Sequence, residues 1–175
     1  YSRTLGDLLF EQAERYGDHP ALIDAGGAVG YAALALRSRR IAAWMQARGI
    51  GRGDRVGLLM NNRAEWVETF FGATMLGAVV VAFSTWSKAD ELDYLFADSG
   101  IRLLITLDNF AGQDFASDIA AIASAPRDIV LLGEGGPAGW IPYRAMLDAE
   151  PLAEPLPPGD GASAVDDAII IYTSG

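Results

Sequence analysis

The clearest structural signal in this chain lies at its end, in Asp166-Asp167-Ala168-Ile169-Ile170-Ile171-Tyr172-Thr173-Ser174-Gly175. The three isoleucines favour a strand buried on both faces, because β-branched side chains suit an extended chain and a parallel sheet hides both of its faces. Open α/β sheets bind ligands in the loops that follow the carboxyl ends of their strands. Hydroxyls and free backbone N–H groups in such a loop can hold phosphate oxygens. Thr173, Ser174 and Gly175 are therefore candidate phosphate-binding residues, and a buried strand that ends in an ordinary polar turn is the alternative.

Four more apolar runs predict strands of the same sheet. They are Val56–Met60, Val79–Phe83, Leu103–Thr106 and Ile129–Leu132, and helical patterns alternate with them. Such alternation is typical of a parallel sheet with right-handed crossovers and helices on both faces. The predicted fold class is therefore α/β, with a parallel sheet flanked by helices.

Changes in pattern along the chain divide it into four segments. Residues 1–49 read as a helix, a hairpin and a second helix that pack on or beside the main sheet, and residues 50–149 as the parallel α/β core. Residues 150–165 are rich in Pro and Gly and are expected to form an exposed linker, from Glu150 to Gly161 in particular. Residues 166–175 supply the last strand and the loop after it.

The spacing of polar residues predicts three helix starts with capping boxes. These are Thr4-Leu5-Gly6-Asp7, Asn62-Arg63-Ala64-Glu65 and Ser87-Lys88-Ala89-Asp90. The second helix carries an apolar stripe that includes Trp66, Phe70 and Phe71, which we expect to belong to the core. A weaker helix is predicted for Phe115–Ala125.

Composition excludes several classes of function. The net charge of −10 gives no excess positive field, so binding to nucleic acid or to an anionic membrane is disfavoured. The absence of cysteine excludes disulfides and thiolate chemistry, and the single histidine, His19, cannot build a metal cluster. The longest apolar run, Ala78–Phe83, is far shorter than the roughly 20 residues that span a bilayer. We expect no transmembrane segment, no metal site and a cytoplasmic location.

Tyr172-Thr173-Ser174-Gly175 resembles the opening of the phosphate loop of the adenylate-forming, AMP-binding enzymes, which continues as Ser/Thr-Thr-Gly-x-Pro-Lys-Gly. Upstream stretches resemble further motifs of this family in the family's order. They are Ala21–Asp24 with Gly30–Leu34, Gly53–Asn62, Met75–Val81 and Glu91–Gly100. The resemblance covers nearly the whole chain and is strongest to acyl-CoA synthetases. Gly30, Ala33 and Ala82-Phe83-Ser84 depart from the family's usual residues.

The resemblance implies that the chain is an N-terminal fragment of an acyl-CoA synthetase, cut at the start of the phosphate loop. The parent would use ATP, Mg²⁺ and CoA to convert a small carboxylic acid into an acyl-adenylate and then a thioester. Thr173, Ser174 and Gly175 would bind the β- and γ-phosphates, whereas the catalytic residues and the metal ligand would lie downstream. The fragment itself is expected to be inactive, with its exposed apolar surface covered by a partner such as a second copy. The alternative is a non-catalytic α/β module that binds a nucleotide or a protein.

Overall fold

The computed structural model describes residues 3–153 and 161–173, and its centre is a six-stranded parallel sheet. All five strand pairings in this sheet are parallel, which confirms the predicted sheet, including the strand at Ile169. A two-residue outer strand was not predicted, because it is too short to show periodicity. In spatial order the strands are β10 (Ile169–Ile171), β4 (Val79–Ala82), β3 (Arg55–Leu59), β5 (Leu103–Leu107), β8 (Asp128–Leu132) and β9 (Ile141–Pro142).

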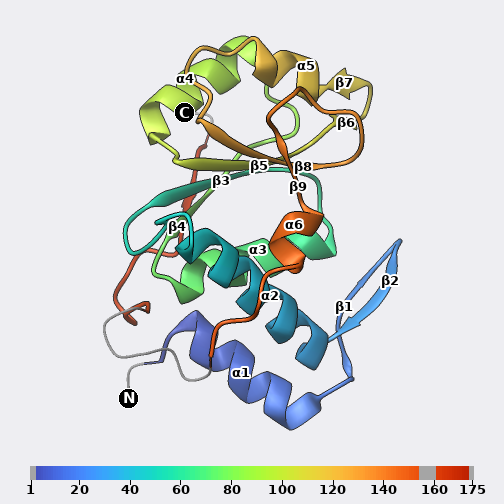
Figure 1. Ribbon diagram of the computed structural model, residues 1–175, viewed down its shortest axis with the longest axis vertical. Helices are drawn as coiled ribbons and strands as arrows, with labels where there is room; N and C mark the ends of the chain where they lie inside the picture. The colour runs from blue at the N-terminus through green and yellow to red at the C-terminus, as the bar shows by residue number, and fades with distance from the viewer. Residues whose placement is uncertain (1–2, 154–160, 174–175) are drawn as a thin grey trace.

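Helices cover both faces of the sheet (Figure 1). Helices α4 (Ala89–Ser99) and α5 (Phe115–Ala120) lie on one face. On the other face lie α2 (Tyr31–Gln46), α3 (Ala64–Met75) and the short α6 (Arg144–Leu147), and α1 (Leu5–Tyr16) packs outside α2 and α3. The chain therefore forms layers around one sheet.

Two small antiparallel hairpins stand apart from the main sheet. The first pairs β1 (Pro20–Asp24) with β2 (Gly27–Gly30), as the sequence predicts, and it projects beside α2 (Figure 1). The second pairs β6 (Asn109–Phe110) with β7 (Gln113–Asp114) and was not predicted. Helix α5 ends five residues before its predicted end, at Ala120 instead of Ala125.

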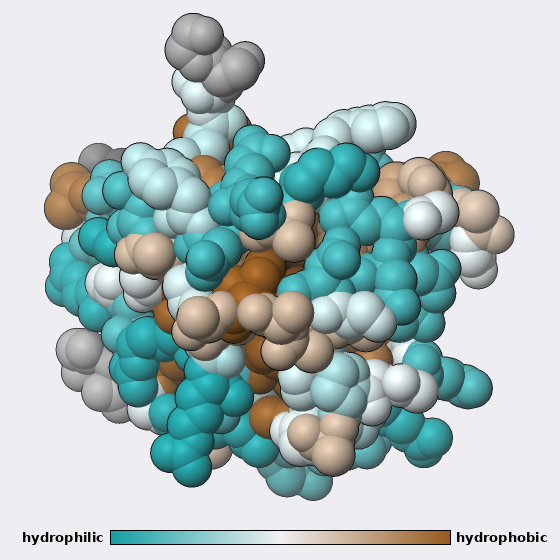
Figure 2. All heavy atoms as spheres, turned by 90° about the horizontal axis from the view of Figure 1, so that it is seen from above, coloured by the Kyte–Doolittle hydropathy of each residue, from teal (hydrophilic) through white to brown (hydrophobic). Residues whose placement is uncertain are grey.

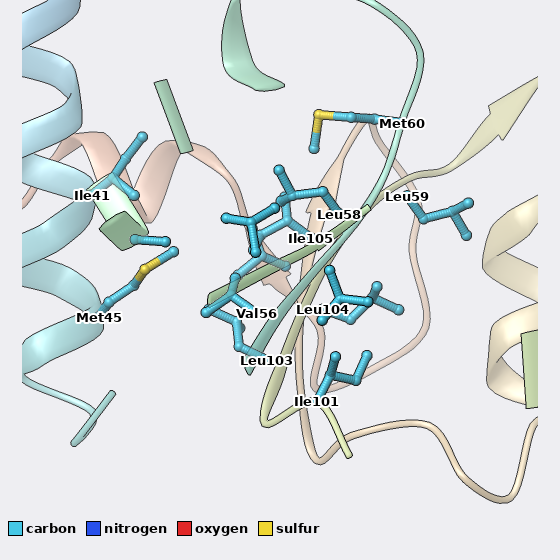
Figure 3. Packing of buried hydrophobic residues seen from close by; sticks show 14 of the residues in the cluster. Ile41, Met45, Val56, Leu58, Leu59, Met60, Ile101, Leu103, Leu104 and Ile105 are labelled. Carbon is cyan, nitrogen blue, oxygen red and sulfur yellow. The ribbon is translucent and has the colours of Figure 1, made fainter. Parts of the chain in front are cut away.

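The core forms on both faces of the sheet because side chains alternate along each strand. Ile41 and Met45 of α2 point toward side chains of β3 and β5, and both are fully buried (Figure 3). Leu59 and Leu104 point to the opposite face, toward the α4 and α5 layer. Two-sided burial explains why these strands read as unbroken apolar runs.

The predicted helix caps are correct at only one of the three starts. Thr4 and Asp7 form the predicted capping box, with hydrogen bonds of 2.9 and 3.1 Å between each side chain and the other residue's backbone N–H. The predictions at Asn62 and Ser87 are wrong, because α3 and α4 begin one residue later, with Arg63 and Lys88 at the N-cap and no side-chain cap bond.

A residue from outside the helix satisfies the first turn of α3 instead. The backbone N–H of Ala64 donates to Oδ2 of Asp24, at the end of β1, over 3.1 Å. A local spacing rule cannot detect this partner, because the bond closes between the hairpin and the helix.

The apolar stripe predicted for α3 is only half-buried. Trp66, Phe70 and Phe71 are partly exposed, and Trp66 stacks on Phe70 with ring centroids 5.4 Å apart. The buried face of α3 instead carries small and polar residues, including Glu68 and Gly72. The prediction that the stripe belongs to the core is therefore only partly correct, because close packing against α2 selects small side chains on the inner face.

Part of the predicted exposed linker is packed against α2. The backbone N–H of Leu152 donates to the carbonyl of Arg39 over 3.3 Å, and Nε of Arg39 donates to the carbonyl of Leu152 over 2.6 Å. The Leu152 side chain also contacts the core, which explains why this segment departs from the predicted linker. Residues 154–160 of the predicted linker lie outside the described residues.

Candidate functional site

The candidate site lies at the carboxyl edge of the sheet, where β10 ends. Because β10 runs parallel to β4, with Ile171 beside Ala82, the residues after both strands leave the same edge. Thr173 is exposed at this edge, as a ligand-binding hydroxyl must be. Ser174 and Gly175 lie outside the described residues, so Thr173 is the one predicted site residue that the structure places.

The side chain of Tyr172 anchors the chain just before Thr173. Its hydroxyl donates a 2.6 Å hydrogen bond to Oδ2 of Asp98 in the last turn of α4. Its ring stacks on Phe83, with centroids 6.5 Å apart and planes 15° apart. Partial burial and the hydrogen bond to Asp98 raise the pKa of Tyr172, because the protonated hydroxyl is the form that donates to the carboxylate. Sequence reasoning missed this contact, because the two partners are far apart in the chain.

The opposite end of β10 is held by an ion pair. Nε of Arg52 donates to Oδ1 of Asp166 over 3.1 Å, and the backbone N–H of Ser163 donates to Oδ2 over 2.7 Å. The bond from Ser163, followed by that from Arg52, lowers the pKa of Asp166. The strand that leads to Thr173 is thus fixed before its first residue and after its last.

A hollow of about 320 Å³ opens beside the end of β4, between Thr85-Trp86 and the β6–β7 hairpin. The Trp86 side chain is 79% exposed, and Nζ of Lys88 reaches Oε1 of Gln113 over 3.2 Å. An exposed ring and an ammonium group can contact a planar or anionic ligand. Sequence reasoning did not select these residues, because the hollow depends on the unpredicted hairpin.

Figure 2 views the molecule from the end that carries α4 and α5. Hydrophobic residues gather there in a limited area that hydrophilic residues surround.

In residues 3–153 and 161–173, no group of three or more His, Cys, Asp or Glu side chains could hold a metal ion. No helix in the same part of the chain is both long enough and apolar enough to cross a membrane.

A buried polar cluster connects α2, α3 and the start of α6. Glu68, which is 1% exposed, accepts hydrogen bonds from Nη1 of Arg37 over 2.7 Å and from the hydroxyl of Tyr143 over 2.9 Å. Burial and the nearby charge of Glu68 raise the pKa of Tyr143. Both carboxylate oxygens are satisfied, so the cluster joins three helices rather than offering a free catalytic group.

Comparisons of structure place this fold among the N-terminal domains of adenylate-forming enzymes. An anthranilate CoA ligase, solved with anthranoyl-AMP, superposes with a TM-score of 0.87 at 25% identity, over 99% of this chain and 33% of that one. A fatty acyl CoA synthetase of Mycobacterium tuberculosis superposes with a TM-score of 0.77 at 29% identity, over 98% of this chain and 32% of that one.

Comparisons of sequence define the family. The profile described as "AMP-binding enzyme" matches residues 9–175, so the chain belongs to the AMP-binding enzyme family of adenylate-forming ligases. A long-chain-fatty-acid–CoA ligase of Salmonella typhimurium is 34% identical over 62% of the chain and 20% of its own length. A salicyl-AMP ligase of Mycobacterium tuberculosis is 29% identical over 99% of the chain and 31% of its own length. The chain thus spans about a fifth to a third of the length of these curated relatives.

Proposed function

We propose that this chain is the N-terminal part of an ATP-dependent acyl-CoA synthetase. The parent enzyme would join a carboxylic acid to AMP with release of pyrophosphate, and then transfer the acyl group to CoA. The observation that carries the proposal is the family match over residues 9–175. It is supported by the position of Thr173, which follows the last strand at the carboxyl edge of the sheet. The short share of each relative's length supports the view that the chain is one part of the enzyme.

In the proposed reaction Thr173, Ser174 and Gly175 begin the loop that holds the β- and γ-phosphates of ATP. Charge moves onto pyrophosphate as it leaves, and hydroxyl and backbone N–H donors placed at this loop stabilise that charge. A Mg²⁺ ion bound with ATP would neutralise part of the same charge. In the parent enzyme, the thiol of CoA would accept the acyl group, and the ligands of the metal would come from outside this chain.

We propose the following division of work in the chain. Residues 1–49 support one face of the sheet, residues 50–149 form the sheet itself, residues 150–165 connect, and residues 166–175 carry the phosphate contacts. The 175-residue chain would be inactive by itself, because its few neutral donors cannot replace the metal and the cations of a complete site. Removal of a single preorganised donor typically costs about 10²–10³ in rate, so the loss of most of them should abolish turnover.

Carboxylate-dependent exchange of pyrophosphate into ATP tests the proposal. The intact gene product should exchange with at least one acid from a panel of aliphatic and aromatic acids, and the 175-residue chain should exchange with none. Thr173→Ala in the intact protein should lower the rate, whereas Tyr16→Phe, which removes a hydroxyl from an exposed residue at the end of α1, serves as the control. No exchange by the intact protein with any acid would instead favour a non-catalytic nucleotide- or protein-binding module.

A further inference from the structure

Asp98 occupies a position that α4 itself does not favour. The helix ends at Ser99, so the Asp98 carboxylate lies in its last turn, where the helix dipole is negative and a negative charge is unfavourable. The contact that the structure gives to this carboxylate is the 2.6 Å hydrogen bond from Tyr172. The position of Asp98 is therefore better explained by Tyr172 than by the stability of the helix.

The end of β10 needs an anchor of this kind. β10 is the outer strand of the described sheet and pairs only with β4 there, and Ile171 is 65% exposed. A short edge strand frays readily at its end. The Tyr172 side chain, which follows immediately, is therefore in a position to decide whether Thr173 stays in place.

Packing against Phe83 holds the Tyr172 ring, in addition to the hydrogen bond that holds its hydroxyl. Phe83, on which the ring stacks, is itself held edge-on by Phe96 of α4, with centroids 5.0 Å apart. Phe83 also fills the space left by Gly57, where an added Cβ would lie 2.8 Å from Cε2 of Phe83. The ring of Tyr172 thus rests on a rigid aromatic layer, and the hydrogen bond sets the direction of its hydroxyl.

The acceptor is also held firmly. Nη1 of Arg55, at the start of β3, donates to the carbonyl of Ser99 over 2.6 Å and so ties the last turn of α4 to the sheet. Asp98 precedes this anchored residue. The carboxylate that receives the Tyr172 hydroxyl therefore has little freedom to move.

From this geometry we propose that Asp98 is a positioning residue for the phosphate-binding loop, and that it acts through the hydroxyl of Tyr172. The hydrogen bond fixes the direction in which Thr173 leaves the sheet. This inference rests on the proposed function for its effect on ATP, but the effect on the end of β10 is independent of catalysis.

The first test is hydrogen exchange of the backbone amides of residues 170–173 in the intact protein. Tyr172→Phe and Asp98→Ala should each speed this exchange about tenfold, because local opening of the strand end loses one restraint. Asp98→Asn retains an acceptor oxygen and should restore most of the protection. Tyr94→Phe removes the hydroxyl of an exposed tyrosine on the same helix and serves as the matched control.

The second test is kinetic and uses the acid that supports pyrophosphate exchange. In Tyr172→Phe and Asp98→Ala the KM for ATP should rise about tenfold, as expected for the loss of one charge-assisted hydrogen bond, while the KM for the acid stays unchanged. The melting temperature of Asp98→Ala should fall only slightly, because the removal of an unfavourable charge from the helix end offsets part of the lost hydrogen bond.

The outcomes separate this inference from the proposed function. Unchanged hydrogen exchange in both variants would overturn the role of Asp98, whether or not the enzyme is active. Faster hydrogen exchange with an unchanged KM for ATP would overturn the role of Asp98 in ATP binding. If the wild-type protein exchanges no pyrophosphate, the proposed function fails, while faster hydrogen exchange in both variants would still support Asp98 as the anchor of the strand end.

Discussion

Tyr143 and Glu68 form a hydrogen bond of 2.9 Å in the protein interior, between the start of α6 and the middle of α3. Arg37 binds the other oxygen of the same carboxylate from a partly exposed position. A buried carboxylate of this kind depends on both donors, because removal of one leaves an unsatisfied charged atom that water cannot easily reach. The two hydrogen bonds to Glu68 therefore stabilise the packing of α6 against α2 and α3, and their contribution to the free energy of unfolding can be measured.

Tyr143→Phe should destabilise the protein by about 1–3 kcal/mol, because one oxygen of Glu68 loses its donor while the packing of the ring is retained. Urea unfolding followed by far-UV circular dichroism measures this change. Tyr94→Phe removes a hydroxyl from an exposed ring and should change stability by less than about 0.5 kcal/mol. Equal effects of the two substitutions would contradict a special role for the Tyr143 hydroxyl.

Stability should fall at alkaline pH because of the same tyrosine. Burial and the charge of Glu68 raise the pKa of Tyr143 above its ordinary value of 10.0. The unfolded state therefore releases this proton first, so the contribution is complete below about pH 10 and is lost above it, by up to about 1.4 kcal/mol per pH unit. Unfolding free energies measured between pH 9 and 11 should show a shallower decline in Tyr143→Phe than in wild type. Parallel curves for the two proteins would refute the assignment.

Asp24→Ala should destabilise the protein by about 0.5–2 kcal/mol, the usual range for loss of an N-cap, because the N–H of Ala64 then loses its partner. Amide exchange in the first turn of α3 should also become faster, although the substitution is made in the hairpin. Asp18→Ala, in the exposed turn before β1, is the matched control. If both substitutions leave α3 protected, the hairpin does not cap the helix.

Gly72→Ala should destabilise the protein by about 1–3 kcal/mol, although alanine is the better helix former. The added Cβ would lie 2.7 Å from Cγ2 of Ile41 and 2.9 Å from the carbonyl oxygen of Ser38, so α2 and α3 would have to separate. At Gly51 an added Cβ has no neighbour within 4 Å, and Gly51→Ala should be close to neutral. Thermal unfolding of the two variants decides the point, and a stabilised Gly72→Ala would show that the helices can move apart at little cost.

The sequence predicted the sheet well because burial on both faces leaves an unmistakable local pattern. Val56, Val80 and Ile105 each belong to an apolar run, and all three are fully buried. The helix starts were harder, since the cap of α3 comes from Asp24, in another element. The small side chains on the inner face of α3 reflect its contact with α2, which the sequence of α3 alone does not reveal.

The candidate site was predictable only in part for the same reason. Thr173 could be selected from its place after an apolar strand. The hydrogen bond between Asp98 and Tyr172 could not be predicted, because β5 and β8 separate the two residues in the sequence and only the folded sheet brings them together. Contacts that span such distances leave no periodic signal in a single sequence.

The parallel pairing of β10 with β4 also sets an order of events during biosynthesis. Ile169 completes the edge beside Val80, so the ribosome must make everything between them before β4 gains this neighbour. At ordinary rates of translation that delay is on the order of ten seconds. During this time the Val79–Val81 run has an unpaired edge that a strand of another nascent chain could occupy. Aggregation of the nascent chain should therefore depend on β4, before the ribosome has made Thr173.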